Sequence, residues 1–135
     1  MNLVEKLRAI DQKKFDEIQT KELYSKQLSK LLGEDTIIRI QAIDGELFSS
    51  LSGTGLDKNG DVDYNRVFSA NAKIVAEGVI EPNLKDESLL KHLGVASPAE
   101  AAKKIFHGEI NTISVEITEL SGFLSEQETE KQVKN

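Results

Sequence analysis

The sequence predicts a single α+β domain, with a small sheet near its N-terminus and a helical C-terminal half. The best strand in the chain covers residues 36–43, where β-branched residues alternate and place Ile38, Ile40 and Ala42 on one face. After residue 63 the apolar residues recur at helical spacing. A chain of 135 residues is about the usual size of one domain, and the sequence contains no internal repeat or interdomain linker.

Two elements are expected before that strand. Apolar residues at i, i+4 and i+7 predict an amphipathic helix over about residues 2–14. Residues 16–33 are ambiguous, since residues 18–24 could form a short strand, while leucines at helical spacing end at Gly33, a typical residue just past a helix. The pair Asp44–Gly45 gives a turn signal after the strand. The apolar positions of the first helix are Leu3, Val4, Leu7 and Ile10.

A glycine-rich loop separates the sheet from the later helices. Three glycines within residues 52–63 disfavour a stable helix there. A helix is expected from about residue 64 until Pro82 ends it, because the residue before a proline avoids the α region. A short helix follows over residues 86–93, with Gly94 as its stop.

The last two helices have clearer boundaries. Ser97, Pro98 and Glu100 form a capping box, in which Ser97 caps an N–H of the first turn and Glu100 reaches back to the N–H of Ser97. That helix is expected to extend to His107. Residues 109–124 fit a helical stripe, although their isoleucines and valine also alternate as in a strand. The helical stripe is the longer pattern, so we favour a helix.

The composition excludes several functional classes. The net charge is −6 and the basic residues are interspersed with acids, so neither nucleic acid nor a membrane surface is an expected partner. The absence of cysteine excludes disulfide frameworks, zinc–thiolate sites and cysteine nucleophiles. The sequence shows no signal peptide and no apolar run long enough to span a membrane. We therefore expect a soluble protein of the cytoplasm.

One segment has part of the pattern of a metal site. Residues 57–63 place aspartates and an asparagine at alternate positions, as in a calcium-binding EF-hand loop. The pattern then fails, because Val62 occupies the position that requires glycine and Phe68 the position that requires a bidentate glutamate. We interpret the segment as a turn followed by Asp63 as the cap of the next helix.

The sequence contains no recognisable catalytic constellation. The loop glycines at 53 and 55 lack the lysine and hydroxyl residue of a phosphate-binding loop. His92 and His107 lie near the ends of separate helices, and neither has a histidine or carboxylate at i+4. No serine lies in a Gly-x-Ser-x-Gly elbow. The sequence therefore predicts a protein without enzymatic activity, cofactor or bound metal.

Three segments in the second half of the chain occur in an order that resembles a known family. They are Glu-Pro-x-Leu at 81–84, Phe-x-Gly-Glu-Ile at 106–110 and Leu-Ser-Gly-Phe at 120–123. Together they resemble the XkdN-like tail assembly chaperones of phages and of defective prophages in Gram-positive bacteria. The similarity is expected to extend over residues 1–124 as one domain. The polar segment 125–135 is expected to be a disordered tail.

The resemblance implies a function that the residue chemistry does not supply. Such chaperones bind the long tape measure protein, keep it soluble and help to recruit tail tube subunits during tail morphogenesis. They act in the cytoplasm of the bacterial host and are absent from the finished virion. The expected partners are therefore the tape measure protein, the tail tube protein and further copies of this chain.

A structural virion component, such as a head–tail connector or a tail-completion subunit, is the alternative that the same size, acidity and α+β character allow. For either function the expected working surface is apolar, because the short C-terminal helices need packing partners. The residues expected to form it are Leu84, Leu89, Ile110, Ile113 and Ile117. The alternative, which the sequence favours for any one of these residues, is that the helix faces close a single core.

Overall fold

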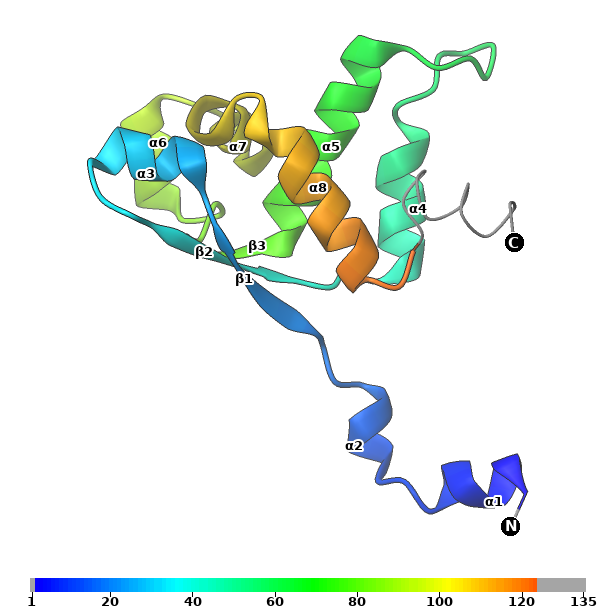
Figure 1. Ribbon diagram of the computed structural model, residues 1–135. Helices are drawn as coiled ribbons and strands as arrows, with labels where there is room; N and C mark the ends of the chain where they lie inside the picture. Colours follow the sequence, from blue (N-terminus) through cyan, green and yellow to red (C-terminus); the bar gives the residue numbers. More distant parts are fainter. Residues whose placement is uncertain (1, 124–135) are drawn as a thin grey trace, which may run out of the picture.

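The computed structural model describes residues 2–123, so the tail predicted at 125–135 lies outside the described residues. Three antiparallel strands form one sheet in the order β1-β2-β3, as Figure 1 shows. They are β1 (Thr20–Tyr24), β2 (Ile37–Gln41) and β3 (Val79–Glu81). The central strand β2 turns Ile38 and Ile40 into the core and leaves its other face exposed. This confirms the strand that alternation predicts there.

The helices that follow β1 lie on one face of this sheet (Figure 1). The central helix is α5 (Tyr64–Gly78), which packs against α7 (Pro98–Phe106) and α8 (Glu109–Leu120). Their buried faces and the inner face of β2 form one core cluster. The largest fully buried side chain in it is that of Phe106. The predicted α+β fold is therefore confirmed, and residues 109–120 are helical rather than a strand.

A helix that the sequence pattern did not predict follows β2. This helix, α4 (Gly45–Gly53), begins where the pair Asp44–Gly45 suggested only a turn. Asp44 serves as its N-cap, since its Oδ2 accepts hydrogen bonds from the backbone N–H groups of Glu46 and Leu47. Phe123, which follows α8 in the chain, stacks on Phe48 of α4 with ring centroids 4.3 Å apart. The turn prediction was wrong because an aspartate side chain accepts nearby backbone N–H groups both in turns and at helix N-termini, so the same residue favours either structure.

The prediction that the central helix continues to Pro82 was also wrong. It ends at Gly78, and the next three residues form the edge strand β3. Val79 is buried in the core and pairs with Ile40 of β2. Both a helical stripe and a strand accept β-branched residues at these positions, and pairing with β2 decides between them.

Two short helices lie at one end of the domain, α3 (Lys26–Leu32) and α6 (Glu87–Leu93). As predicted, each ends at a glycine in the left-handed region, Gly33 with φ of 75° and Gly94 with φ of 70°. The capping box of α7 differs in one detail from the prediction. Glu100 accepts its hydrogen bond from the backbone N–H of Ala96, not from that of Ser97.

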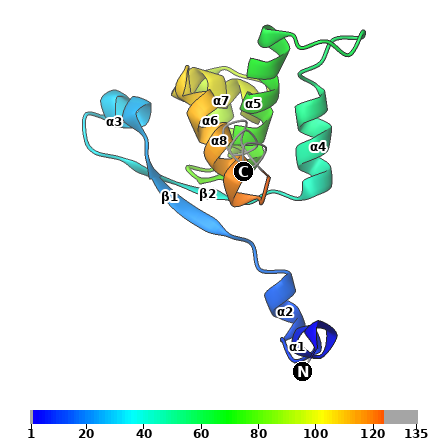
Figure 2. The same ribbon diagram turned by 45° about the vertical axis from the view of Figure 1, so that its right-hand side comes forward.

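Residues 2–19 project away from the domain, and we call them the N-terminal arm. Figures 1 and 2 show the arm leaving from the start of β1 in both views. It contains α1 (Leu3–Arg8) and α2 (Gln12–Phe15), and every described residue in it is exposed. The single helix predicted over 2–14 is thus interrupted. Asp11 accepts the N–H of Lys13 and begins α2 as a separate element.

Candidate protein-binding groove

An apolar groove lies between α3, α6 and the adjoining end of the sheet. Its volume is about 450 Å³. We call it the apolar groove, and its polar lining residues are Thr36, Glu81 and His92. Its apolar lining residues are Leu28, Leu31, Leu32, Ile37, Pro82, Leu89, Leu93 and Ile105.

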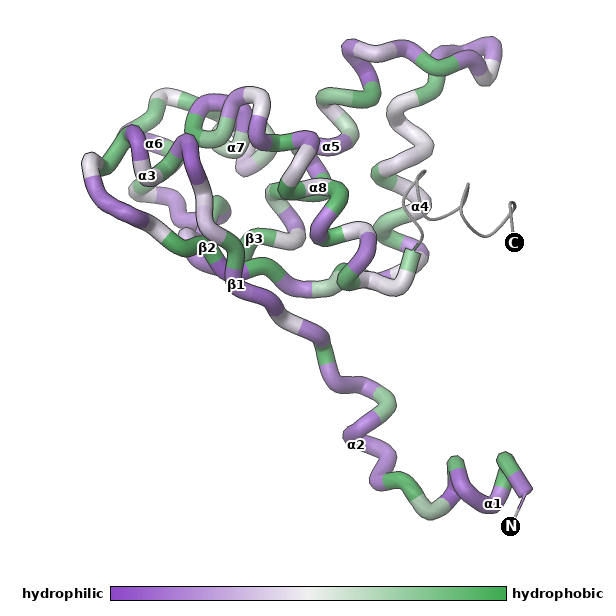
Figure 3. The backbone as a smooth tube through the Cα atoms, viewed as in Figure 1, coloured by the Kyte–Doolittle hydropathy of each residue, from purple (hydrophilic) through white to green (hydrophobic). Residues whose placement is uncertain are grey.

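Large apolar side chains in this groove face solvent. Leu31 is 68% exposed, Leu32 57% and Ile37 59%. Single exposed leucines are normal on protein surfaces, but these three line one hollow. Figure 3 marks hydrophobic residues in green, and green segments occur along both α3 and β2. A contiguous apolar hollow of this kind typically marks a site that binds an apolar surface of another molecule.

The wall formed by α3 is held in place by a carboxylate from α8. Ser25 caps α3 through a hydrogen bond from the N–H of Leu28, and the Ser25 hydroxyl donates to Glu109 Oε1 at 2.5 Å. Glu109 Oε2 accepts the backbone N–H of Lys26 at 2.8 Å. Ser25 is fully buried, so its hydroxyl needs these partners. Glu109 therefore positions the start of α3 against the rest of the fold.

The wall formed by α6 begins at a second cap. Asp86 accepts hydrogen bonds from the hydroxyl of Ser88 and, at 3.0 Å, from the N–H of Leu89. The hydrogen bond from the Ser88 hydroxyl is the main reason why the pKa of Asp86 is lower than usual, and the Leu89 N–H adds to it. The cap fixes the first turn of α6, which carries Leu89 toward the groove.

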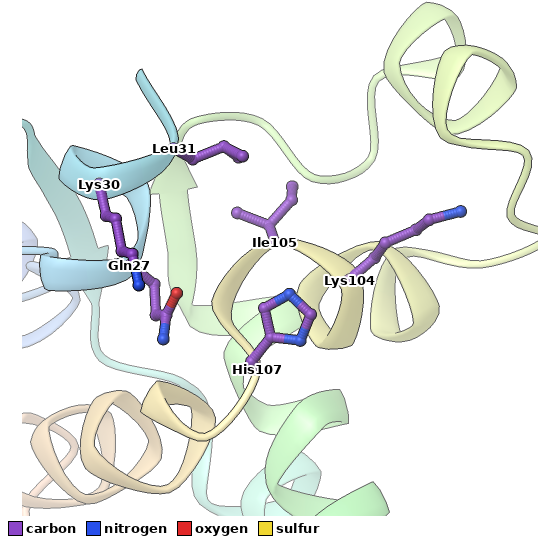
Figure 4. Close-up of a pocket in the computed structure, with 6 residues that line it drawn as sticks. All are labelled: Gln27, Lys30, Leu31, Lys104, Ile105 and His107. Carbon is purple, nitrogen blue, oxygen red and sulfur yellow. The ribbon is translucent and has the colours of Figure 1, made fainter. Parts of the chain in front are cut away.

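A second hollow adjoins the groove and gives it a basic border. Figure 4 shows Leu31 and Ile105, which line both hollows, with Lys30, Lys104 and His107 around them. The Nζ of Lys104 donates to the backbone carbonyl of Leu93 at 2.7 Å, which joins α7 to the end of α6. The groove is therefore an apolar surface with a polar rim, as is typical of protein-binding surfaces.

A family model covers most of the chain. The model of the phage XkdN-like tail assembly chaperone proteins matches residues 19–135. The chain belongs to this family. The match begins just before β1, so residues 1–18 of the expected similarity are not covered. None of the curated proteins compared with the chain matches it.

One solved structure has the same fold. The crystal structure of the protein yqbN superimposes with a TM-score of 0.54 and 21% sequence identity. The alignment covers 78% of this chain and 88% of that chain. At this level of identity the similarity concerns the fold alone, and it supports the architecture described above.

The structure places the five expected contact residues in two different environments. Leu84, Ile110, Ile113 and Ile117 are buried in the core, with at most 3% of each side chain exposed. Leu84 lies in the turn that follows β3, and the three isoleucines of α8 face the same core cluster. Only Leu89 lines the apolar groove.

The contact residues predicted from the sequence did not include Leu31, Leu32 and Ile37, although the sequence contains a signal for them. Leu31 and Leu32 are adjacent on one helix and so point in different directions. Ile37 is on the opposite face of its strand from Ile38 and Ile40, which are buried. Apolar residues out of phase with a core stripe can indicate a binding surface.

The loop that resembled a calcium site has a structural role. Asp57 Oδ1 accepts the N–H groups of Asn59 and Asp61, which closes a turn. Asp63 caps α5, as predicted. Among residues 2–123, no cluster of three or more histidine or acidic side chains is placed to hold a metal ion. No helix within the same residues is long and apolar enough to cross a membrane.

Replacing Glu109 with alanine is expected to loosen α3 without unfolding the core. The change removes both hydrogen bonds that tie the start of α3 to α8 and leaves the buried Ser25 hydroxyl without its acceptor, at a cost of about 1–3 kcal/mol. Hydrogen exchange should become faster in residues 26–32 and stay unchanged in α5. Glu119→Ala, on an exposed position of the same helix, is the control. Equal exchange rates in both variants would show that Glu109 does not position α3.

Proposed function

We propose that this tail assembly chaperone binds the tape measure protein, keeps it soluble and helps to recruit tail tube subunits. The apolar groove is the surface that takes the client. The family supports the general role, and the exposed Leu31, Leu32 and Ile37 in one hollow are the observation that supports the binding mode. We further propose that the chain acts in the host cytoplasm and is absent from the finished virion.

The physical properties of the groove suit such a client. A tape measure protein is long and helical and carries apolar stripes, so it aggregates when it is alone. A groove between two helices can accept such a stripe as a helix laid in a hydrophobic cleft. Each buried leucine contributes about 1.5–3 kcal/mol, which allows contacts that are specific but reversible. The net charge of −6 favours the solubility of the complex.

This function requires no bond to be made or broken. The chaperone acts by covering apolar surface that would otherwise meet water or another client. The proposal therefore assigns no catalytic residue, cofactor or metal to the chain. The residues that bind the client are those of the apolar groove. They include Leu89, one of the five contact residues expected from the sequence.

Leu31→Glu is expected to abolish the effect of the chaperone on its client. The side chain already faces solvent, so the fold should persist, but a carboxylate in the groove opposes an apolar partner. Losing one leucine contact of about 1.5–3 kcal/mol weakens binding by roughly 10- to 100-fold. The measurement is co-expression with the tape measure protein, followed by its soluble fraction and co-purification.

Val62→Glu is the matched control for this experiment. Val62 is also exposed, but it lies in the loop before α5 and outside the groove. The Val62→Glu variant should leave the soluble fraction of the tape measure protein and its co-purification unchanged. If the wild-type chain neither solubilises nor co-purifies with the tape measure protein, the proposed function fails. If both variants behave as wild type, the groove is not the client site.

Mass spectrometry of purified tails separates this function from that of a structural virion component. An assembly chaperone should be absent from finished tails or present only in traces. Presence in a fixed ratio to the tail tube protein would instead favour a connector or completion subunit and would contradict the proposal.

A further inference from the structure

The turn between α7 and α8 holds a histidine in a backbone conformation that favours glycine. His107 has φ of 50° and ψ of −127°, and among residues 2–123 it is the one residue other than glycine with a positive φ. Gly108 follows with φ of −65° and ψ of −17°. These angles are close to those of the two central residues of a type II′ turn, whose first central position is usually glycine. The turn itself therefore gives no reason for a side chain at position 107.

The conformation of His107 is strained, and its side chain does not offset the strain in the core. Residues other than glycine rarely adopt positive φ, and such strain persists only where other interactions hold it. The His107 side chain is exposed, so it contributes no core packing. Strained residues cluster at binding sites, where the backbone holds a side chain in position for a ligand. The strain therefore indicates a role for the imidazole at the surface.

The imidazole of His107 faces the second hollow, which has a volume of about 320 Å³. Figure 4 shows Gln27 and Lys30, both from α3, across this hollow from His107. Lys104 points away from them, and its Nζ donates to the carbonyl of Leu93. An amide, an ammonium group and an imidazole can each donate hydrogen bonds. The hollow thus brings together three donor side chains from two elements that are far apart in the sequence.

The donors of the second hollow lack an acidic partner within the described residues. None of the described residues that line it is an aspartate or a glutamate, although the net charge of the chain is −6. Lys30 lines a neighbouring hollow together with Glu34 and Asp35, but within residues 2–123 it forms no ion pair. Glu109, two residues after His107, uses both of its carboxylate oxygens at the start of α3. The second hollow is therefore suited to an anion supplied from outside.

The second hollow continues the apolar groove. Leu31 and Ile105 line both of them. Residues three or four positions apart on a helix lie on the same face, about one turn of 5.4 Å along the axis. A client helix that fills the groove and runs toward Leu31 and Ile105 therefore carries its next turn over the second hollow. An acidic residue in that turn would lie opposite the three donors.

We propose that the second hollow binds a carboxylate side chain of the client, one helical turn beyond the apolar residues that fill the groove. Lys30 pairs with the carboxylate, and Gln27 and His107 donate hydrogen bonds to it. This carboxylate site rests on the proposed function, since the groove must take a helix of the client. Charge complementarity contributes more to specificity than to affinity. The site therefore selects which apolar stripe of a long client is bound, and in which direction.

Peptides of the tape measure protein test the carboxylate site. Overlapping peptides of about 20 residues, about 30 Å long as helices, cover its sequence and are probed with the full chain. The peptides that bind should carry an aspartate or glutamate one turn beyond an apolar stripe. The best of them is then compared by fluorescence anisotropy with a copy in which glutamine replaces that acid. The copy should bind about 5- to 10-fold more weakly, and the difference should shrink at high salt.

Lys30→Gln identifies the partner of the acid. It should weaken binding of the acidic peptide by about two- to fivefold and leave binding of the glutamine copy unchanged. Lys30 is exposed, so the fold should persist, which circular dichroism checks. Lys73→Gln is the matched control, since it removes the same charge from an exposed position of α5 that lines neither the groove nor the second hollow. An equal loss for both peptides in Lys30→Gln, or the same selective loss in Lys73→Gln, would overturn the carboxylate site.

His107→Gly separates a role in binding from a role in the turn. Glycine adopts positive φ without strain, so the melting temperature should stay the same or rise. Binding of the acidic peptide should nevertheless weaken, while binding of the glutamine copy should not change. A variant that binds the acidic peptide as well as wild type would contradict the proposed contact, as would a lower melting temperature, which would mean that the turn itself requires histidine.

The peptide experiment also distinguishes failure of the carboxylate site from failure of the proposed function. If peptides bind equally well with and without the acid, the carboxylate site fails and the groove remains the client site. If no peptide binds, the groove does not take a helix of the client, and the carboxylate site fails with it. The proposed function is decided separately, by the solubility of the tape measure protein on co-expression.

Discussion

Phe106→Ala is expected to lower the free energy of unfolding by about 3–5 kcal/mol. Phe106 is the largest fully buried side chain among the described residues, and it lies at the end of α7 in the core cluster. Truncation removes the ring from the core and leaves a cavity that the surrounding helices can fill only in part. Since whole domains are stable by only about 5–15 kcal/mol, the variant should be close to unfolding at physiological temperature.

The measurement is denaturant unfolding followed by circular dichroism. All variants are compared at one protein concentration, because any association of copies would raise the apparent stability by mass action. Phe15→Ala is the matched control, since Phe15 lies on the exposed arm and its removal should change stability by no more than about 0.5 kcal/mol. Similar losses in the two variants would contradict the assignment of Phe106 to the core.

Local signals in the sequence predicted the elements whose boundaries depend on single residues. Gly33 and Gly94 end their helices because only glycine adopts positive φ without strain. Ser97 and Asp63 begin helices because their side chains satisfy free N–H groups. These interactions involve neighbours in the chain, so the sequence pattern contains the information that is needed.

The sequence was a poorer guide where the outcome depended on distant parts of the chain. Val79 fits a helical stripe, yet it is in a strand because β2 offers hydrogen bonds on its free edge. Asp44 fits a turn, yet it begins α4, a helix that packs against α5. In both cases local preference allowed two structures and tertiary contacts selected one.

The contact residues were also difficult to predict, because their exposure depends on distant parts of the chain. A stripe such as Ile110, Ile113 and Ile117 tells which side chains share a helix face, but not whether another element covers that face. Here α5 and the sheet cover it. Most of the exposed large apolar residues are instead in the first half of the chain, many of them on the arm and around the end of α3. A search for apolar residues left over after the core is assigned would have found them.

The arm and the groove show where a chaperone of this size places its exposed apolar surface relative to its core. Its helical core is closed, and the apolar surface that remains available is placed on separate, small elements at its edge. Such a surface can be covered or uncovered without disturbing the core, because α3 and the arm contribute few of the buried side chains. Reversible binding then costs little folding free energy.

Gly78→Ala is expected to destabilise the domain by about 1–3 kcal/mol, and removal of Ile117 should reverse the effect. A Cβ at position 78 would lie 2.4 Å from Cδ1 of Ile117, 2.8 Å from Cγ1 and 2.9 Å from Cγ2. A β-branched side chain on a helix has one preferred χ1 rotamer, so Ile117 cannot move all three atoms away. The close approach of α5 and α8 therefore requires glycine at this position.

A double-mutant cycle measures this contact directly. Ile117→Ala alone should cost about 2–5 kcal/mol through the cavity that it leaves. In that background Gly78→Ala no longer meets the three atoms and should be neutral or stabilising, by up to about 1 kcal/mol, since alanine restricts the unfolded chain. Gly53→Ala is the matched control, because Gly53 also ends a helix but has nothing within 4 Å of an added Cβ. Additive effects at positions 78 and 117 would mean that α5 and α8 are not packed as tightly as the structure shows.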